Sequence, residues 1–174
     1  MSMPLPAVGT VLRALAAPRA VMDMVQGMLA LRVARRDLAT APTGALLPLS
    51  AASAQGDGAN ADGPPAALSE AQRWARALKR AERYGPWRGA CLVRSLALHR
   101  LLVAHSVPGS VVRVGVRARG TFEAHAWVEV GGVVVGDRPA VQQQWTPLGS
   151  STLQGGDSGT ATRLALQALR REVA

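Results

Sequence analysis

FEAHAWVEVGGVVVGD, residues 122–137, has the alternation of two β-strands joined by a tight turn. Small apolar residues alternate with larger or polar ones, as expected of a strand with two different faces. Two glycines and a run of valines follow, and the run ends in Gly-Asp. The stretch therefore predicts a β-hairpin that carries His125 in its first strand and Asp137 at the end of its second.

The position of Asp137 relative to His125 depends on the length of the turn. A two-residue loop sets Asp137 opposite Ala126, on the other face of the hairpin from His125. A three-residue loop, which commonly has a glycine in the left-handed conformation, places Asp137 directly across from His125. We expect this register or an equivalent bulge, with Asp137 orienting the imidazole. Glu123, two positions away on the same strand, is the alternative.

The only cysteine of the chain, Cys91, begins the leucine-rich helix predicted for residues 91–106. Unpaired backbone N–H groups and the helix dipole at that end favour a thiolate, although a lone cysteine also fits a small buried hydrophobe. His99 and His105 follow on the same helix, roughly 12 and 21 Å away at about 1.5 Å per residue. Only His125 can be brought to Cys91 by folding.

Three further segments have a clear period. Residues 7–40 and 68–84 have the spacing of amphipathic helices, with Ser69 as the expected N-cap of the second. SVVRVGVRARG, residues 110–120, alternates as a strand does. We therefore expect an α+β fold in which the helix that begins at Cys91 packs on a small antiparallel sheet, with extra N-terminal helices.

The composition divides the chain into four segments. Residues 42–65 are rich in Gly, Ala, Pro and Ser and have no apolar period, which is typical of a flexible linker. The expected organisation is an N-terminal helical segment, the linker, a core, and a tail with a possible helix, at residues 1–41, 42–66, 67–148 and 149–174.

Composition and charge exclude several classes of protein. The chain has 174 residues, enough for one domain with its own core. Its single cysteine rules out an internal disulfide and argues against a cysteine-based zinc site, so a cytoplasmic, reducing compartment is expected. The net charge of +9 suits an acidic partner, but no nucleic-acid-binding motif is present and no nucleic acid is expected. Charges interrupt every apolar run of about 18 residues, so no stable membrane insertion is expected.

The chain resembles the lasso-peptide leader peptidases, a branch of the transglutaminase-like, papain-related cysteine proteases. The resemblance covers roughly residues 74–137 and is carried by PWRGACLVRSLALHRLL, SVPGSVVRVGV and FEAHAWVEVGGVVVGD, at residues 86–102, 106–116 and 122–137. It implies a transglutaminase-like core with a catalytic triad of Cys91, His125 and Asp137. No metal ion and no cofactor are implied.

The resemblance also implies an activity and its partners. The substrate is a ribosomally made precursor peptide, whose leader is cut off by the cysteine peptidase. An asparagine-synthetase-like lasso cyclase, which uses ATP, then joins the freed N-terminus to an acidic side chain. A separate leader-recognition protein is expected because residues 1–66 lack the strand pattern of a fused recognition domain. Two alternatives are a transglutaminase-like acyl transferase or deamidase with the same triad, and a non-catalytic basic adaptor that binds peptide.

Five residues near the triad are candidates for substrate binding. Trp87, Phe122 and Trp127 are large aromatic side chains close in sequence to Cys91 or His125. Arg113 and Arg117 lie on the preceding strand, where they can hold acidic groups of a leader or partner. The alternative for the arginines is that they only keep the protein soluble.

Overall fold

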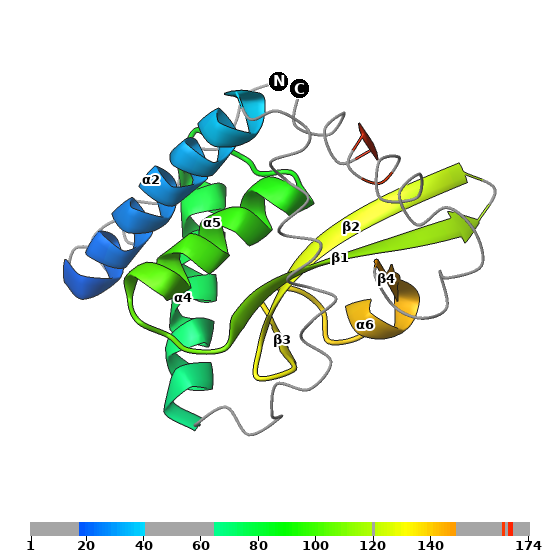
Figure 1. Cartoon of the computed structure of the whole chain (residues 1–174). Helices are drawn as coiled ribbons and strands as arrows, with labels where there is room; N and C mark the ends of the chain where they lie inside the picture. Colours follow the sequence, from blue (N-terminus) through cyan, green and yellow to red (C-terminus); the bar gives the residue numbers. More distant parts are fainter. Residues whose placement is uncertain (1–17, 41–64, 120, 149–164, 166, 169–174) are drawn as a thin grey trace.

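The computed structural model describes residues 18–40, 65–119, 121–148, 165, 167 and 168, without the side chains of residues 118–122 (Figure 1). The helices are α2 (Pro18–Thr40), α4 (Pro65–Tyr84), α5 (Cys91–Ala104) and α6 (Val141–Gln144). The strands are β1 (Ser110–Arg119), β2 (Thr121–Val130), β3 (Val133–Val135) and β4 (Thr146–Pro147).

The four strands form one antiparallel sheet in the order β3-β2-β1-β4. Helix α5 packs against β1 and β2 and also against α2 and α4, so it lies between the other long helices and the sheet (Figure 1). The predicted α+β class, with the cysteine helix on a small antiparallel sheet and additional N-terminal helices, is confirmed. Strand β4, which pairs with β1, was not predicted.

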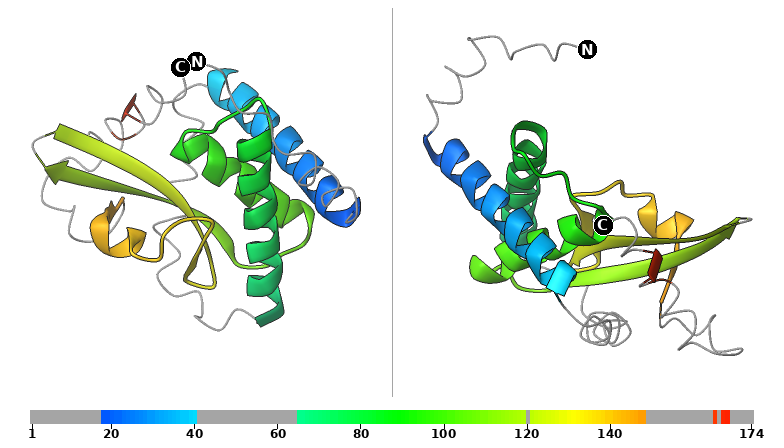
Figure 2. Two further views of the ribbon diagram at one scale, coloured as in Figure 1. Left: turned by 180° about the vertical axis from the view of Figure 1, so that it is seen from behind. Right: turned by 90° about the horizontal axis from the view of Figure 1, so that it is seen from above.

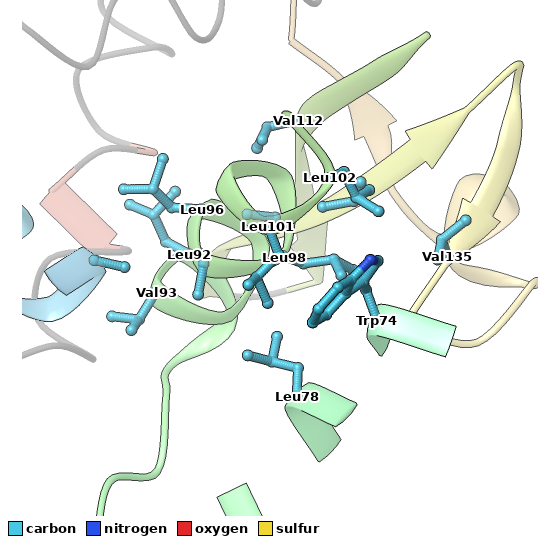
Figure 3. Close-up of a cluster of buried hydrophobic side chains, with 14 of the residues drawn as sticks. Trp74, Leu78, Leu92, Val93, Leu96, Leu98, Leu101, Leu102, Val112 and Val135 are labelled. Atoms are coloured by element: carbon cyan, nitrogen blue, oxygen red, sulfur yellow. The ribbon is translucent and has the colours of Figure 1, made fainter. Parts of the chain in front are cut away.

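The hydrophobic core is built around α5, whose leucines point in several directions (Figure 3). Trp74 and Leu78 of α4 contact it from one side, and Leu31 of α2 is also in this core. A helix that is apolar on most of its surface is stable only when it is buried on several sides. Each fully buried leucine contributes roughly 1.5–3 kcal/mol. The core therefore holds α5 firmly, and with it the position of Cys91.

The start of the second predicted helix differs from the structure. Helix α4 begins at Pro65, a residue suited to the first helical position because it has no N–H to leave unpaired. Ser69 therefore lies inside the helix, where its hydroxyl donates to the carbonyl oxygen of Ala66, and its prediction as N-cap is wrong. The linker and the tail fall almost wholly outside the described residues; residues 165, 167 and 168 are helical.

The register of the β2–β3 hairpin differs from the prediction. Val130 pairs with Val133, so Gly131 and Gly132 form a two-residue loop. Both glycines have positive φ, 55° and 77°, which is what a tight type I′ hairpin turn requires. The predicted three-residue loop is therefore wrong, because two successive glycines permit the shorter turn. Strand β3 ends at Val135, so Asp137 is not part of the ladder.

Candidate active site

The start of α5 lies beside an open part of the edge of β2. Strand β3 pairs only with residues 128–130, and no other described strand follows β2 on that side next to His125. Here the buried Ser95 donates a hydrogen bond of 2.9 Å to the carbonyl oxygen of Ala126. Figure 2 shows α5 beginning beside the middle of β2. Because Ser95 lies one turn after Cys91, this bond brings the cysteine beside the histidine.

The loop before Cys91 is fixed by an ion pair between two helices. Glu82 of α4 accepts hydrogen bonds from Nε of Arg94 at 3.1 Å and from the backbone N–H of Gly89 at 3.2 Å. Arg94 also donates to the carbonyl oxygen of Gly89 at 3.3 Å. The N-cap residue Ala90 has no side-chain oxygen, so no side chain caps the first turn of α5. The first backbone N–H groups of an α-helix have no partner within the helix.

Cys91, His125 and Asp137 are connected by hydrogen bonds. Nε2 of His125 lies 2.7 Å from Oδ2 of Asp137, and His125 is also hydrogen-bonded to Cys91. The other carboxylate oxygen of Asp137 accepts the backbone N–H of Arg138 at 2.7 Å. Because Nε2 is engaged by the carboxylate, Nδ1 is the ring nitrogen left for the thiol. The three side chains that the sequence reasoning selected are therefore brought together.

Gly136 turns the chain so that Asp137 reaches His125. Its φ is +81°, a left-handed conformation that glycine adopts at little cost. A Cβ atom at this position would lie 2.9 Å from Cδ2 of Leu98, which is closer than packed carbon atoms approach. Asp137 thus reaches the imidazole from a turn at the end of β3, not from a cross-strand position.

The hydrogen bonds change the pKa of both ionisable partners. The hydrogen bond to Asp137, followed by the one to Cys91, raises the pKa of His125 from 6.5 to about 9, against the opposing effect of burial. Burial alone would raise the pKa of Asp137, but the bonds from His125 and from the backbone of Arg138 lower it. At neutral pH the pair is therefore imidazolium and carboxylate, with the charges about 2.7 Å apart.

Two tryptophans stack with the imidazole. The Trp145 ring lies 5.2 Å from the His125 ring, at an interplanar angle of 25°, and the Trp127 ring lies 6.3 Å away, at 19°. Gly115 pairs with His125 across the strands, and a Cβ there would lie 2.8 Å from Cβ of Trp145 and 2.9 Å from the Trp127 ring. Sequence reasoning missed Trp145, whose only signal is that it is one of four tryptophans in an aromatic-poor chain.

The candidate substrate-binding residues on the sheet are mostly engaged within the protein. Trp127 is 1% exposed and its indole N–H donates to Glu129, so it packs beside His125 and offers little surface to a substrate. Arg113 is largely buried and pairs with the same glutamate at 3.1 Å. Arg117 pairs with Glu123, and its guanidinium lies over the Trp145 ring. These contacts argue against the predicted roles of Trp127 and Arg113.

The other two candidates lie elsewhere. Trp87 is partly buried in the loop before Cys91, and the guanidinium of Arg32 lies 5.9 Å from its ring centre. This contact joins the loop to α2. Phe122 is in β2, but its side chain lies outside the described residues. Substrate binding by either residue stays a prediction.

Neither a membrane-spanning helix nor a metal-binding cluster is found in the described part of the chain. No helix there is both long enough and apolar enough to cross a bilayer. In the same residues, no group of three or more His, Cys, Asp or Glu side chains is arranged to hold a metal ion.

Comparison with known families agrees with the fold. The family model of the transglutaminase-like superfamily matches residues 24–150, which is 127 of the 174 residues. The chain belongs to this superfamily. The transglutaminase-like core predicted from the sequence is thereby confirmed, and the match includes most of α2 as well as the sheet. No solved structure gives a significant match.

Among curated proteins, this superfamily member is similar to the microcin J25-processing protein McjB of Escherichia coli. The two are 41% identical over 54 residues, which is 31% of this chain and 25% of McjB. The matched part thus spans about a quarter of that relative's length. The similarity supports the resemblance to lasso-peptide leader peptidases.

Proposed function

We propose that the protein is a cysteine endopeptidase that removes the leader from a ribosomally synthesised lasso precursor peptide. The observation that carries the proposal is the hydrogen-bonded series Cys91, His125 and Asp137 at the start of a buried helix. A nucleophile, a base and a group that orients the base are the parts that covalent acyl transfer needs. Membership of the transglutaminase-like superfamily and similarity to a protein named for processing microcin J25 support it.

In the first half of the reaction, Cys91 attacks the carbonyl carbon of the scissile peptide bond. With its pKa raised to about 9, His125 already holds the proton as the imidazolium at neutral pH, and the sulfur attacks as the thiolate of that ion pair. The backbone N–H groups at the start of α5, where no side chain caps the helix, stabilise the negative charge on the carbonyl oxygen. His125 then passes the proton to the departing amine, which frees the N-terminus of the core peptide and leaves the leader as a thioester on Cys91.

In the second half, water resolves the thioester. His125, now neutral, takes a proton from the water as it attacks, and the leader leaves as a carboxylic acid. The proton stays on His125, which restores the imidazolium beside the freed sulfur. Asp137 keeps Nε2 of His125 engaged throughout, so that Nδ1 stays directed at the sulfur.

The proposed partners follow from this role. A separate leader-recognition protein presents the precursor, and an asparagine-synthetase-like lasso cyclase uses the amine that the cut frees. Both partners are proposed from the resemblance. Neither partner requires this chain to bind a cofactor.

A second candidate function is acyl transfer or deamidation, which superfamily membership favours. Cys91 would again form a thioester, but with the side-chain carbonyl carbon of a glutamine, and ammonia would leave. An amine or water would then complete the reaction. The products differ in mass: a leader peptidase gives two peptides, a deamidase a one-dalton increase, and a transglutaminase an isopeptide crosslink.

The test uses a lasso precursor peptide together with the proposed leader-recognition protein. Mass spectrometry follows the precursor with the wild-type protein and with Cys91→Ala. A single cut at the leader boundary with the wild type alone supports the peptidase, with Cys91 as its nucleophile. No cut with either protein, despite measured binding of the leader, would favour a non-catalytic adaptor that binds peptide.

A further inference from the structure

We infer that a cationic groove along α4 binds acidic side chains of the peptide substrate next to the triad, an inference that rests on the proposed function. The net charge of the chain is +9, but Arg113 and Arg117 on β1 already pair with glutamates. Cations that can bind an acidic partner must therefore lie elsewhere. The groove along α4 contains such cations.

The groove consists of two adjacent hollows of about 720 and 330 Å³. They share Lys79, Glu82 and Arg94, so the hollows adjoin. One reaches Asp137, and the other reaches Gly89, two residues before Cys91. Six cationic side chains line the two hollows, namely Arg76, Lys79, Arg83, Arg88, Arg94 and Arg138.

The carboxylates in the groove do not balance these charges. Glu82 is engaged by Arg94 and by the backbone of Gly89, and Asp137 is engaged by His125. Five of the cations are exposed and have no carboxylate of a described residue within ion-pair distance, namely Arg76, Lys79, Arg83, Arg88 and Arg138. A concave surface with several charges of one sign concentrates the field and attracts the opposite charge.

The shape and lining of the groove fit a peptide with carboxylate side chains. Its floor includes apolar side chains, Ala75, Leu78 and Leu98, against which a chain with short acidic residues can lie. None of the described side chains that line the two hollows is aromatic, whereas sites for single-stranded nucleic acids use aromatic rings to stack bases. Because both hollows reach residues next to the triad, a peptide held there is close to Cys91.

The first experiment measures binding without cleavage. The full-length Cys91→Ala protein is titrated into a short fluorescein-labelled peptide of alternating Glu and Ala, and fluorescence anisotropy is recorded. The matched probe has Gln in place of every Glu. We expect the Gln peptide to bind at least about tenfold more weakly, and the difference to shrink at high salt. Equal binding of the two peptides would refute the inference.

The second experiment locates the binding. Arg76→Gln together with Lys79→Gln removes two exposed cations from the groove, and we expect the affinity for the Glu peptide to fall about fivefold. The control, Arg35→Gln with Arg36→Gln, removes the same charge from the exposed surface of α2 and should leave the affinity unchanged. An equal loss in both variants would mean that only net charge matters. Tighter binding of a single-stranded DNA oligonucleotide, in competition with the peptide, would also overturn the inference.

The two proposals can fail separately. Cleavage of the precursor by the wild type without any preference for the Glu peptide would refute the groove and keep the peptidase. Groove-dependent binding of the Glu peptide without cleavage by the wild type would refute the peptidase and keep the groove as a binding site. Circular dichroism of both double variants checks that they fold.

Discussion

Oδ2 of Asp137 lies 2.7 Å from Nε2 of His125, although the hairpin that carries both residues does not pair them. The contact forms because β3 ends at Val135 and Gly136 turns the chain back toward β2. The carboxylate thus depends on a left-handed glycine and not on strand register. Replacing Asp137 therefore tests the hydrogen bond to His125, whereas replacing Gly136 tests the turn that places the carboxylate.

Asp137→Asn is expected to return the pKa of His125 from about 9 toward 6.5, because the carboxylate is the largest cause of the shift. The amide can still accept or donate at Nε2 but no longer favours the imidazolium. Precursor cleavage should fall on the order of 10²- to 10⁴-fold. NMR titration of the histidine ring measures the pKa, and a value that stays near 9 in the variant would refute the assigned cause.

The same pair predicts a pH dependence of stability. Since folding raises the pKa of His125, its contribution is fully present below about pH 6.5 and is lost as the pH rises through about 9. The free energy of unfolding of the wild type should exceed that of Asp137→Asn by on the order of 2 kcal/mol near pH 6, and by much less above pH 9. Urea unfolding across this range measures the gap. A gap that is constant with pH would contradict the prediction.

The sequence allowed the members of the site to be selected, but not the way in which they meet. Cys91 is the only cysteine, and the rise of a helix excludes His99 and His105, so the choice of His125 needed only local geometry. The predicted register of the hairpin was wrong because the φ angles of two adjacent glycines, which fix the loop length, cannot be read from the sequence.

Two further features had no sequence signal strong enough to predict them. Glu82 and Arg94 are on different helices, and their pairing depends on how those helices cross. Trp145 follows three glutamines in a segment without a period, and it meets His125 only because β4 pairs with β1. Contacts of this kind are set by tertiary packing and not by local periodicity.

Gly136→Ala is expected to disturb the site more than Gly132→Ala does. Both glycines have positive φ, so both substitutions carry the same backbone penalty of about 1 kcal/mol. At Gly132 the added methyl group meets nothing within 4 Å, whereas at Gly136 it lies 2.9 Å from Leu98. Urea unfolding and precursor cleavage, measured for both variants, should show the larger loss at Gly136. Equal losses would mean that the close approach of Leu98 to residue 136 does not limit which residue can stand there.

Ser95→Ala is expected to weaken the attachment of α5 to β2. The variant leaves the carbonyl oxygen of Ala126 without its buried partner, at a cost of about 1–3 kcal/mol in the free energy of unfolding. Ser69→Ala is the matched control, because its hydroxyl makes an exposed bond within α4 and its loss should cost less than about 0.5 kcal/mol. Thermal and urea unfolding compare the two. A cost at Ser95 no larger than at Ser69 would show that the bond does not secure the helix.

Trp145 is expected to position His125, and its replacement should lower kcat more than it raises KM. The ring stacks on the imidazole at 5.2 Å, and such a contact contributes about 0.5–1.5 kcal/mol, so Trp145→Leu should reduce kcat up to about tenfold. Trp145→Phe keeps an aromatic face and should recover most of the loss. Kinetics of precursor cleavage give both constants for each variant. If Leu and Phe behave alike, or if only KM changes, the tryptophan does not act through the orientation of the histidine.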